Sequence, residues 1–218
     1  MKKFWVLGLL FALGILSGCG NSDISLVKKG TMKGHETTTI GKAFEASFND
    51  SKWEAFETKK GERVVQFTGN ISKDLHNSVT NEVRQLLRGQ DNEPKELQDF
   101  QAFVAKLNFF QLAVEKFGGD KSNFFQDLNK KYGCELNHVN YAGGVRARTP
   151  KCKDKETEFQ YMDDVIDAFL NESWKVGEPV EVQWIVAPDG KTFNLSYMGS
   201  AAWPQGVTFE NILAAIYK

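Results

Sequence analysis

The fold is decided by the stretch VEVQWIVAPDGKTFNLSY, residues 180–197. Apolar residues occupy every second position from Val180 to Val186, which is the period of a strand with one well-buried face. The sequence Pro188-Asp189-Gly190-Lys191 is a strong hairpin signal, and an alternating segment resumes at Phe193. The stretch therefore predicts two antiparallel strands joined by a tight turn.

Segments near both ends of the chain complete a small domain around this hairpin. Residues 63–71 alternate in the same way and predict another strand, whereas Trp53 and Phe56, three apart, predict a helical turn. Ile40 follows a run of threonines that offers an N-cap, and residues 209–216 predict a closing helix. We therefore expect an α+β fold, with a small antiparallel sheet of about three strands packed against N- and C-terminal helices.

The middle of the chain has helical periodicity instead. Apolar residues recur at three- and four-residue spacing in four segments, which lie near residues 75–87, 97–117, 122–132 and 157–172. One interpretation is a mainly helical insertion, residues 73–177, into a discontinuous domain formed by residues 27–72 and 178–218. The other is a tandem duplication, because an Ala-Phe, Trp and Val-Gln-aromatic series occurs twice. Its spacings are unequal, so we favour the insertion.

The first residues of the chain predict export. Lys2 and Lys3 precede an apolar run, residues 4–18, which suits a signal peptide and is shorter than the roughly 20 residues that span a bilayer. The run ends in Leu16-Ser17-Gly18-Cys19, which resembles the lipobox of bacterial lipoproteins. A plain secretory signal with a chance cysteine is the alternative.

The lipobox resemblance has several implications. It implies removal of residues 1–18, a diacylglyceryl group on the Cys19 thiol and acylation, for example with palmitate, of the new N-terminus. Because Gly20 rather than aspartate follows, it also implies transport to the outer membrane of a Gram-negative cell. Residues 19–26 are then expected to form a lipidated tether, and residues 26–33 an extended segment.

Cys134 and Cys152 remain once Cys19 is acylated. In an exported chain we expect these two cysteines to form a disulfide bond, which would close a loop rich in turn-forming and polar residues. Such a bridge contributes about 3 kcal/mol by the chain-entropy argument. Two free thiols are one alternative, and a catalytic cysteine–histidine pair with His138 is another.

Composition and motifs argue against several classes of function. The 27 basic and 28 acidic side chains provide no concentrated basic surface, so we expect no nucleic-acid partner. The histidines at 35, 76 and 138 stand in separate polar contexts that are typical of surface residues rather than metal ligands. No nucleophile elbow, phosphate loop, zinc helix or calcium loop occurs. We predict a protein that is not an enzyme and that has no metal or cofactor.

Short motifs at the two ends of the chain form a further pattern. In order, they are VKKG (27–30), TIGKAF (39–44), KWEAF (52–56), VVQFTG (64–69), VQWI (182–185) and TFNL (192–195). Together they resemble a small domain found in many exported or membrane-tethered bacterial proteins. That family has no defined function and supplies no catalytic residues, and residues 73–176 fall outside the resemblance.

Two surface features are candidates for contact with a partner. Tyr141, Arg146 and Arg148 lie in the loop between the two cysteines. Tyrosine and arginine are common at interface hot spots, and a constrained loop loses little entropy on binding. Trp203, which precedes a proline, is the second candidate, although a tryptophan there is also suited to covering the open end of a sheet.

Each of two residue clusters in the helical middle has two possible interpretations. Phenylalanines between residues 100 and 125 are typical of a core, and the alternative is a cavity for a lipid or other apolar ligand. Asp163, Asp164 and Asp167 are typical of the solvated face of a helix, and the alternative is a cation site or an acid–base pair.

We therefore predict a lipoprotein of the cell envelope with a non-enzymatic role as a protein-interaction or structural module. It would be held to the membrane by acylated Cys19 and would face the periplasm or the cell surface, with another envelope protein as its partner. The alternatives are a binder of lipid or another apolar ligand, and an inhibitor or immunity-type lipoprotein that acts through the Tyr141 loop.

Overall fold

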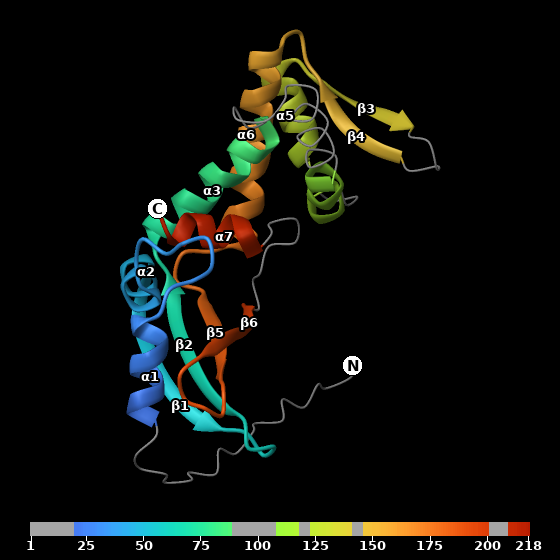
Figure 1. Ribbon diagram of the computed structural model, residues 1–218. Helices are drawn as coiled ribbons and strands as arrows, with labels where there is room; N and C mark the ends of the chain where they lie inside the picture. The colour runs from blue at the N-terminus through green and yellow to red at the C-terminus, as the bar shows by residue number, and fades with distance from the viewer. Residues whose placement is uncertain (1–19, 89–107, 118–122, 141–145, 201–208) are drawn as a thin grey trace.

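The computed structural model describes residues 20–88, 108–117, 123–140, 146–200 and 209–218 (Figure 1). These residues form a mixed α+β structure, which confirms the predicted fold class. An antiparallel sheet with its covering helices occupies one end of the molecule, and a helical body with a second, two-stranded sheet occupies the other. Within the described ranges, no helix is both long and apolar enough to cross a membrane.

The larger sheet has four antiparallel strands in the order β1-β2-β5-β6. Their bounds are Phe48–Glu57 for β1, Arg63–Ile71 for β2, Pro179–Val186 for β5 and Phe193–Gly199 for β6. The hairpin β5–β6 forms where the alternating pattern and its turn predict it. Strand β2 pairs directly with β5, although the helical segment separates them in the sequence. Both ends of the chain therefore share one sheet.

Strand β1 corrects the prediction of a helical turn at Trp53 and Phe56, and it makes the sheet one strand wider than expected. Trp53 faces the covering helices and stacks on Trp184 at 5.6 Å between ring centroids, whereas Phe56 is 37% exposed on the other face. A bulge near Asp50, whose φ is +53°, interrupts the strand register. Because the bulge and the outward Phe56 disturb the two-residue period, the apolar spacing resembles that of a helix.

Helix α1, Gly20–Lys29, corrects the predicted tether and extended segment. Val27 is fully buried under the sheet, and the buried Asp23 carboxylate pairs with the Arg63 guanidinium. A Cβ atom at Gly30 would lie only 2.3 Å from Phe193 Cζ, so glycine is what lets the end of α1 approach β6. The chain is therefore folded against the sheet from Gly20 onward.

Helices α2, Ile40–Ser47, and α7, Phe209–Ile216, form where the sequence predicts them. Thr39 caps α2 by accepting a hydrogen bond from Lys42 N at 3.4 Å. Phe44 of α2 is fully buried and meets Phe67 and Trp184 edge-to-face, at centroid distances of 5.2 and 5.5 Å. These aromatic contacts form the centre of the core on the covered side of the sheet.

The helical body contains α3, Lys73–Arg88, residues 108–117, α5, Phe124–Tyr132, and α6, Lys155–Ser173. Between α5 and α6 the chain forms β3, Glu135–Asn140, and β4, Arg146–Lys151. This hairpin corrects the prediction of a loop between the cysteines. Its strands are short and largely polar, without the apolar alternation that indicates a half-buried strand. The buried hydrophobic residues of both parts form one continuous cluster.

Candidate functional site

The predicted site residues fall into three groups in the structure. Cys19, Tyr141 and Trp203 lie outside the described residues. Arg146 and Arg148 lie on β4, where their backbones pair with Asn140 and His138 of β3. Cys134 and Cys152 are joined by a disulfide bond with a Cα–Cα distance of 4.4 Å. The structure therefore places the described candidates on one element, which we call the arm: β3, β4 and their disulfide.

The disulfide closes the arm where it joins the helical body, because Cys134 immediately precedes β3 and Cys152 immediately follows β4. Strand residues Glu135 and Lys151 pair next to it. An isolated two-stranded hairpin is marginally stable in water. The covalent closure compensates for this by removing conformations from the unfolded chain. The disulfide therefore explains how so polar a hairpin stays folded at the end of the molecule.

Both connections of the arm to the helical body are capped. Gly133 ends α5 in the left-handed conformation, with φ of +64°, and Cys134 N donates to Asn129 O at 3.1 Å. On the other side, Asp154 caps α6 by accepting a hydrogen bond from Thr157 N at 2.7 Å. Hydrogen bonds from Thr157 hold the pKa of the Asp154 carboxyl below its usual range. The arm therefore leaves the helices in a defined direction.

The outer edges of β3 and β4 carry backbone groups that no other described strand pairs with. Strands β3 and β4 pair only with each other within the described part of the chain. An unpaired strand edge presents N–H and C=O groups that a strand of another protein can extend. The arm can therefore bind an extended peptide segment without any catalytic group.

A polar cleft lies between α3 and α6, near the junction of the helical body with the sheet. Its volume is about 420 Å³, and it is lined by His76, Asn77, Thr80, Asn81, Arg84, Asp167 and Asn171. His76 is only 9% exposed, which corrects its assignment as a surface histidine. His76 Nδ1 donates to the Trp174 carbonyl at 2.6 Å, and Thr80 Oγ1 donates to His76 O at 2.8 Å. These bonds compensate for the burial of the imidazole.

The charged groups of the cleft join the two helices. Arg84 of α3 forms ion pairs with Asp167 and Asp163 of α6, and Arg88 pairs with Asp163 at 2.5 Å. Burial raises the pKa of the Asp167 carboxyl, and the neighbouring Arg84 opposes that rise. Since each lining charge has an opposite partner, we interpret this cleft as the seam that holds α3 against α6.

The aspartates of α6 are consequently more than a solvated face. Asp164 accepts hydrogen bonds from Lys131 Nζ at 2.6 Å and from Tyr132 Oη at 2.8 Å, which ties α5 to α6. The ion pair raises the pKa of the Lys131 ammonium. No cluster of three metal-ligating side chains occurs among the residues whose positions are described.

The described phenylalanines of the helical body pack on one another. Phe109 meets Phe169 at 5.1 Å between centroids, and Phe110 meets Phe125 at 6.1 Å. All four side chains are buried, and neither described cavity is lined by a phenylalanine. This packing is typical of a hydrophobic core.

Comparisons of the chain with protein-family models, with curated proteins and with solved structures find no match. The resemblances to a lipobox and to a small exported domain therefore remain predictions from the sequence.

The sequence pointed to His76 and Asp167 separately but did not predict that they share a cleft, although a signal for it exists. His76, Thr80 and Arg84 recur at four-residue intervals on α3, and Asp163 and Asp167 do so on α6. Polar stripes at helical spacing can mark a seam between two helices as well as a solvated face. The sequence could not distinguish these possibilities, because the partner charges lie about eighty residues apart.

Proposed function

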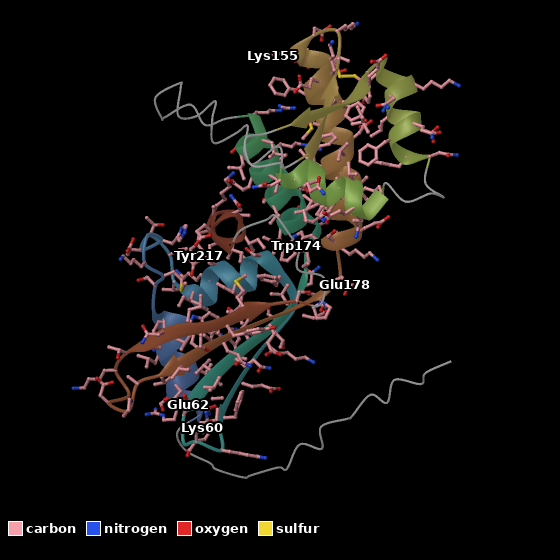
Figure 2. The ribbon with its side chains drawn as sticks, turned by 90° about the vertical axis from the view of Figure 1, so that its right-hand side faces the viewer. Lys60, Glu62, Lys155, Trp174, Glu178 and Tyr217 are labelled. Atoms are coloured by element: carbon pink, nitrogen blue, oxygen red, sulfur yellow. A yellow bond between two sulfur atoms is a disulfide. The ribbon has the colours of Figure 1, made fainter. Side chains whose placement is uncertain are left out.

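We propose that this chain is a bacterial envelope lipoprotein that is anchored by acylated Cys19 and binds another protein through its arm. Its role is non-enzymatic, and its membrane is the outer membrane of a Gram-negative cell. One observation carries the proposal: the residue that follows Cys19 and the arm lie at opposite ends of the molecule. In Figure 2, Lys155, next to the arm, and Lys60, in the turn between β1 and β2, mark these ends.

The junction between the two parts supports this role because it is firmly bonded. Ile71 N donates to Glu178 O and Gly177 N donates to Ile71 O, both at 2.9 Å, at the point where the two chain crossings meet. Ser72 Oγ donates to Ser47 O at 2.6 Å, which fixes the start of α3 to the end of α2. Helix α7 also packs on α3. The helical body is therefore held firmly against the sheet and continues the molecule in one direction.

The dimensions suit a module that holds a binding element away from a membrane. A strand of the length of β2 spans about 30 Å, and a helix of the length of α6 spans about 28 Å. Stacked end to end, they place the arm on the order of 50 Å from the anchored end. A disulfide in the arm also suits an oxidising compartment outside the cytosol.

Capture of the partner from gently solubilised envelopes tests the proposal. The bait is the full-length lipidated protein, compared with a Tyr141→Ala, Arg146→Ala double variant of the arm. The matched control is a Lys52→Ala, Glu54→Ala double variant on the exposed side of β1. We expect the wild type and the control to capture the same protein, and the arm variant to lose it.

Two checks make the result decisive. The arm variant must keep the disulfide, measured by the mass of the unreduced protein, and it must keep the melting temperature of the wild type. A reproducibly solitary monomer, or capture that the arm variant leaves unchanged, would contradict binding through the arm. If the captured protein is an enzyme and binding blocks its activity, the result favours the alternative of an inhibitor or immunity-type lipoprotein.

A further inference from the structure

Helix α1 leaves no room for a flexible tether between the anchor and the folded domain. It begins at Gly20, the residue that directly follows Cys19 in the sequence. Consecutive Cα atoms across a trans peptide lie about 3.8 Å apart. Any acyl chain carried by Cys19 is therefore attached within one residue of a folded element.

Helix α1 is in turn fixed to the sheet. Arg63 Nε donates to Asp23 Oδ2 at 2.9 Å, and a second hydrogen bond joins the same two side chains. Lys28 Nζ pairs with Glu45 Oε1 of α2 at 2.5 Å, and Val27 is fully buried. A two-pronged carboxylate–guanidinium pair restrains the position and orientation of α1 relative to the sheet. Helix α1 is therefore part of the folded domain, and only the bonds of Cys19 and its lipid would separate that domain from the membrane.

The end of the sheet next to Gly20 carries the turn between β1 and β2. A Cβ atom at Gly20 would lie 3.6 Å from Ala55 Cβ, close to the end of β1. Figure 1 shows the start of α1 and the β1–β2 turn together at the lower end of the molecule. We call this region the base; it consists of the start of α1, residues 56–62 and residues 187–192.

The β1–β2 turn is already ordered by its own hydrogen bonds. Thr58 N donates to Glu62 O at 2.8 Å, and Gly61 N donates to Thr58 O at 2.9 Å. The hydroxyl oxygen of Thr58 also accepts from Lys60 N at 3.3 Å and from Glu62 N at 3.1 Å. A surface that is ordered before contact loses little entropy on docking.

The charges of the base balance, and one aromatic ring is exposed beside them. Lys59, Lys60 and Lys191 oppose Glu57, Glu62 and Asp189, and all six residues are exposed. Phe56, next to the turn, is 37% exposed. Phenylalanine and lysine side chains occur together in protein segments that lie at the boundary between water and hydrocarbon, with the lysine ammonium extended toward water. This composition suits a bilayer surface of low net charge better than a strongly anionic partner.

We infer that the base docks on the bilayer, with the β1–β2 turn and Phe56 in the headgroup region, so that the arm points away from the membrane. This inference rests on the proposed acylation of Cys19. The acyl chains supply the binding energy. The short connection through α1 keeps the base next to the bilayer, and contact of the base with the headgroups sets the orientation. Because the charges of the base balance, salt has little effect on the docked geometry.

Fluorescence quenching in vesicles tests the orientation. Full-length lipidated protein carries an environment-sensitive fluorophore at Lys60→Cys, or at Lys155→Cys as the matched control at the far end. Both labelled proteins are reconstituted in zwitterionic phosphatidylethanolamine–phosphatidylcholine vesicles that contain brominated lipid. We expect the fluorophore at position 60 to lose most of its intensity and to shift to the blue. The fluorophore at position 155 should keep the emission intensity and wavelength that it has in buffer.

Flotation of the same vesicles separates the two proposals. If the protein floats and the two positions are quenched equally, docking of the base is overturned while the anchor stands. If the protein does not float, the proposed anchor fails, and this inference fails with it.

A linker variant completes the test. A Gly-Ser insertion of about twelve residues between Cys19 and Gly20 gives a mean reach of about 20 Å. The variant should still float but should lose most of the quenching at position 60. Quenching that survives the insertion would overturn the role of the direct α1 connection.

Discussion

The sheet end and the helical end of this molecule are stabilised by different means. Around the sheet, segments far apart in sequence pair through the backbone and enclose large aromatic side chains such as Trp184 and Phe44. In the helical end, ion pairs such as Arg84–Asp167 join neighbouring helices, and a disulfide closes a polar hairpin. The sheet end is therefore stabilised by a large apolar core, whereas the arm at the helical end depends on a covalent bridge.

The largest expected effect comes from breaking the sheet end. Trp184 is fully buried and contacts Phe44 and Trp53, so Trp184→Ala should reduce the free energy of unfolding by about 3–5 kcal/mol. Because the core is continuous, we expect circular dichroism and tryptophan fluorescence to report one urea transition. The control is Val176→Ala, at a side chain that is 52% exposed and should lose little stability. Unchanged stability of Trp184→Ala would contradict this description of the core.

The next effect should stay within the helical end. Replacing both cysteines with serine, Cys134→Ser and Cys152→Ser, removes a bridge worth about 3 kcal/mol by the chain-entropy argument. Hydrogen exchange should then accelerate much more in β3 and β4 than in β2 and β5. Equal acceleration in the sheet would show that the two ends do not differ as described.

A smaller effect should appear at the junction of α1 with the sheet. Asp23→Asn weakens the buried pair with Arg63, and we expect a loss of about 1–3 kcal/mol, because hydrogen bonds to charged groups contribute that much. Hydrogen exchange should accelerate in α1 and should change little in the other elements. Asn21→Ala, at an exposed position of the same helix, is the matched control. If both variants behave alike, the ion pair does not fix α1.

The smallest effect concerns alkaline pH and the helical end. Burial raises the pKa of the Tyr161 hydroxyl, which donates to Asn129 Oδ1 at 2.9 Å. Unfolded tyrosine ionises near pH 10, so the folded state loses stability as the pH rises above about 10. Tyr161→Phe should cost about 1 kcal/mol at neutral pH and should reduce the loss above pH 10. Melting temperatures from pH 7 to 11 measure both effects, and an unchanged alkaline slope would contradict the assignment.

The sequence predicted those elements whose signals are local. Strands β5 and β6 follow from strict alternation around a Pro-Asp-Gly turn, and α2 follows from its threonine cap and apolar face. In the middle of the chain, α3, residues 108–117, α5 and α6 followed from their three- and four-residue spacing in the same way, whereas residues 97–107 of the second predicted segment lie outside the described residues.

The missed elements depend on distant contacts. Helix α1 is short, and its stabilising pair joins Asp23 to Arg63, forty residues away. The bulge near Asp50 interrupts the period of β1, and the polar strands of the arm depend on a disulfide rather than on a buried face. Predicting the cleft at His76 would have required the register of α3 against α6, and no local sequence pattern contains that information.

Metabolic labelling with palmitate is the decisive experiment, because the proposed anchor and the proposed orientation of the arm both depend on acylation of Cys19. Cells that produce the wild-type chain and a Cys19→Ala variant are grown with labelled palmitate, and the protein is isolated under denaturing conditions. We expect label in the wild type and none in the variant. An unlabelled wild-type protein would contradict the proposed acylation.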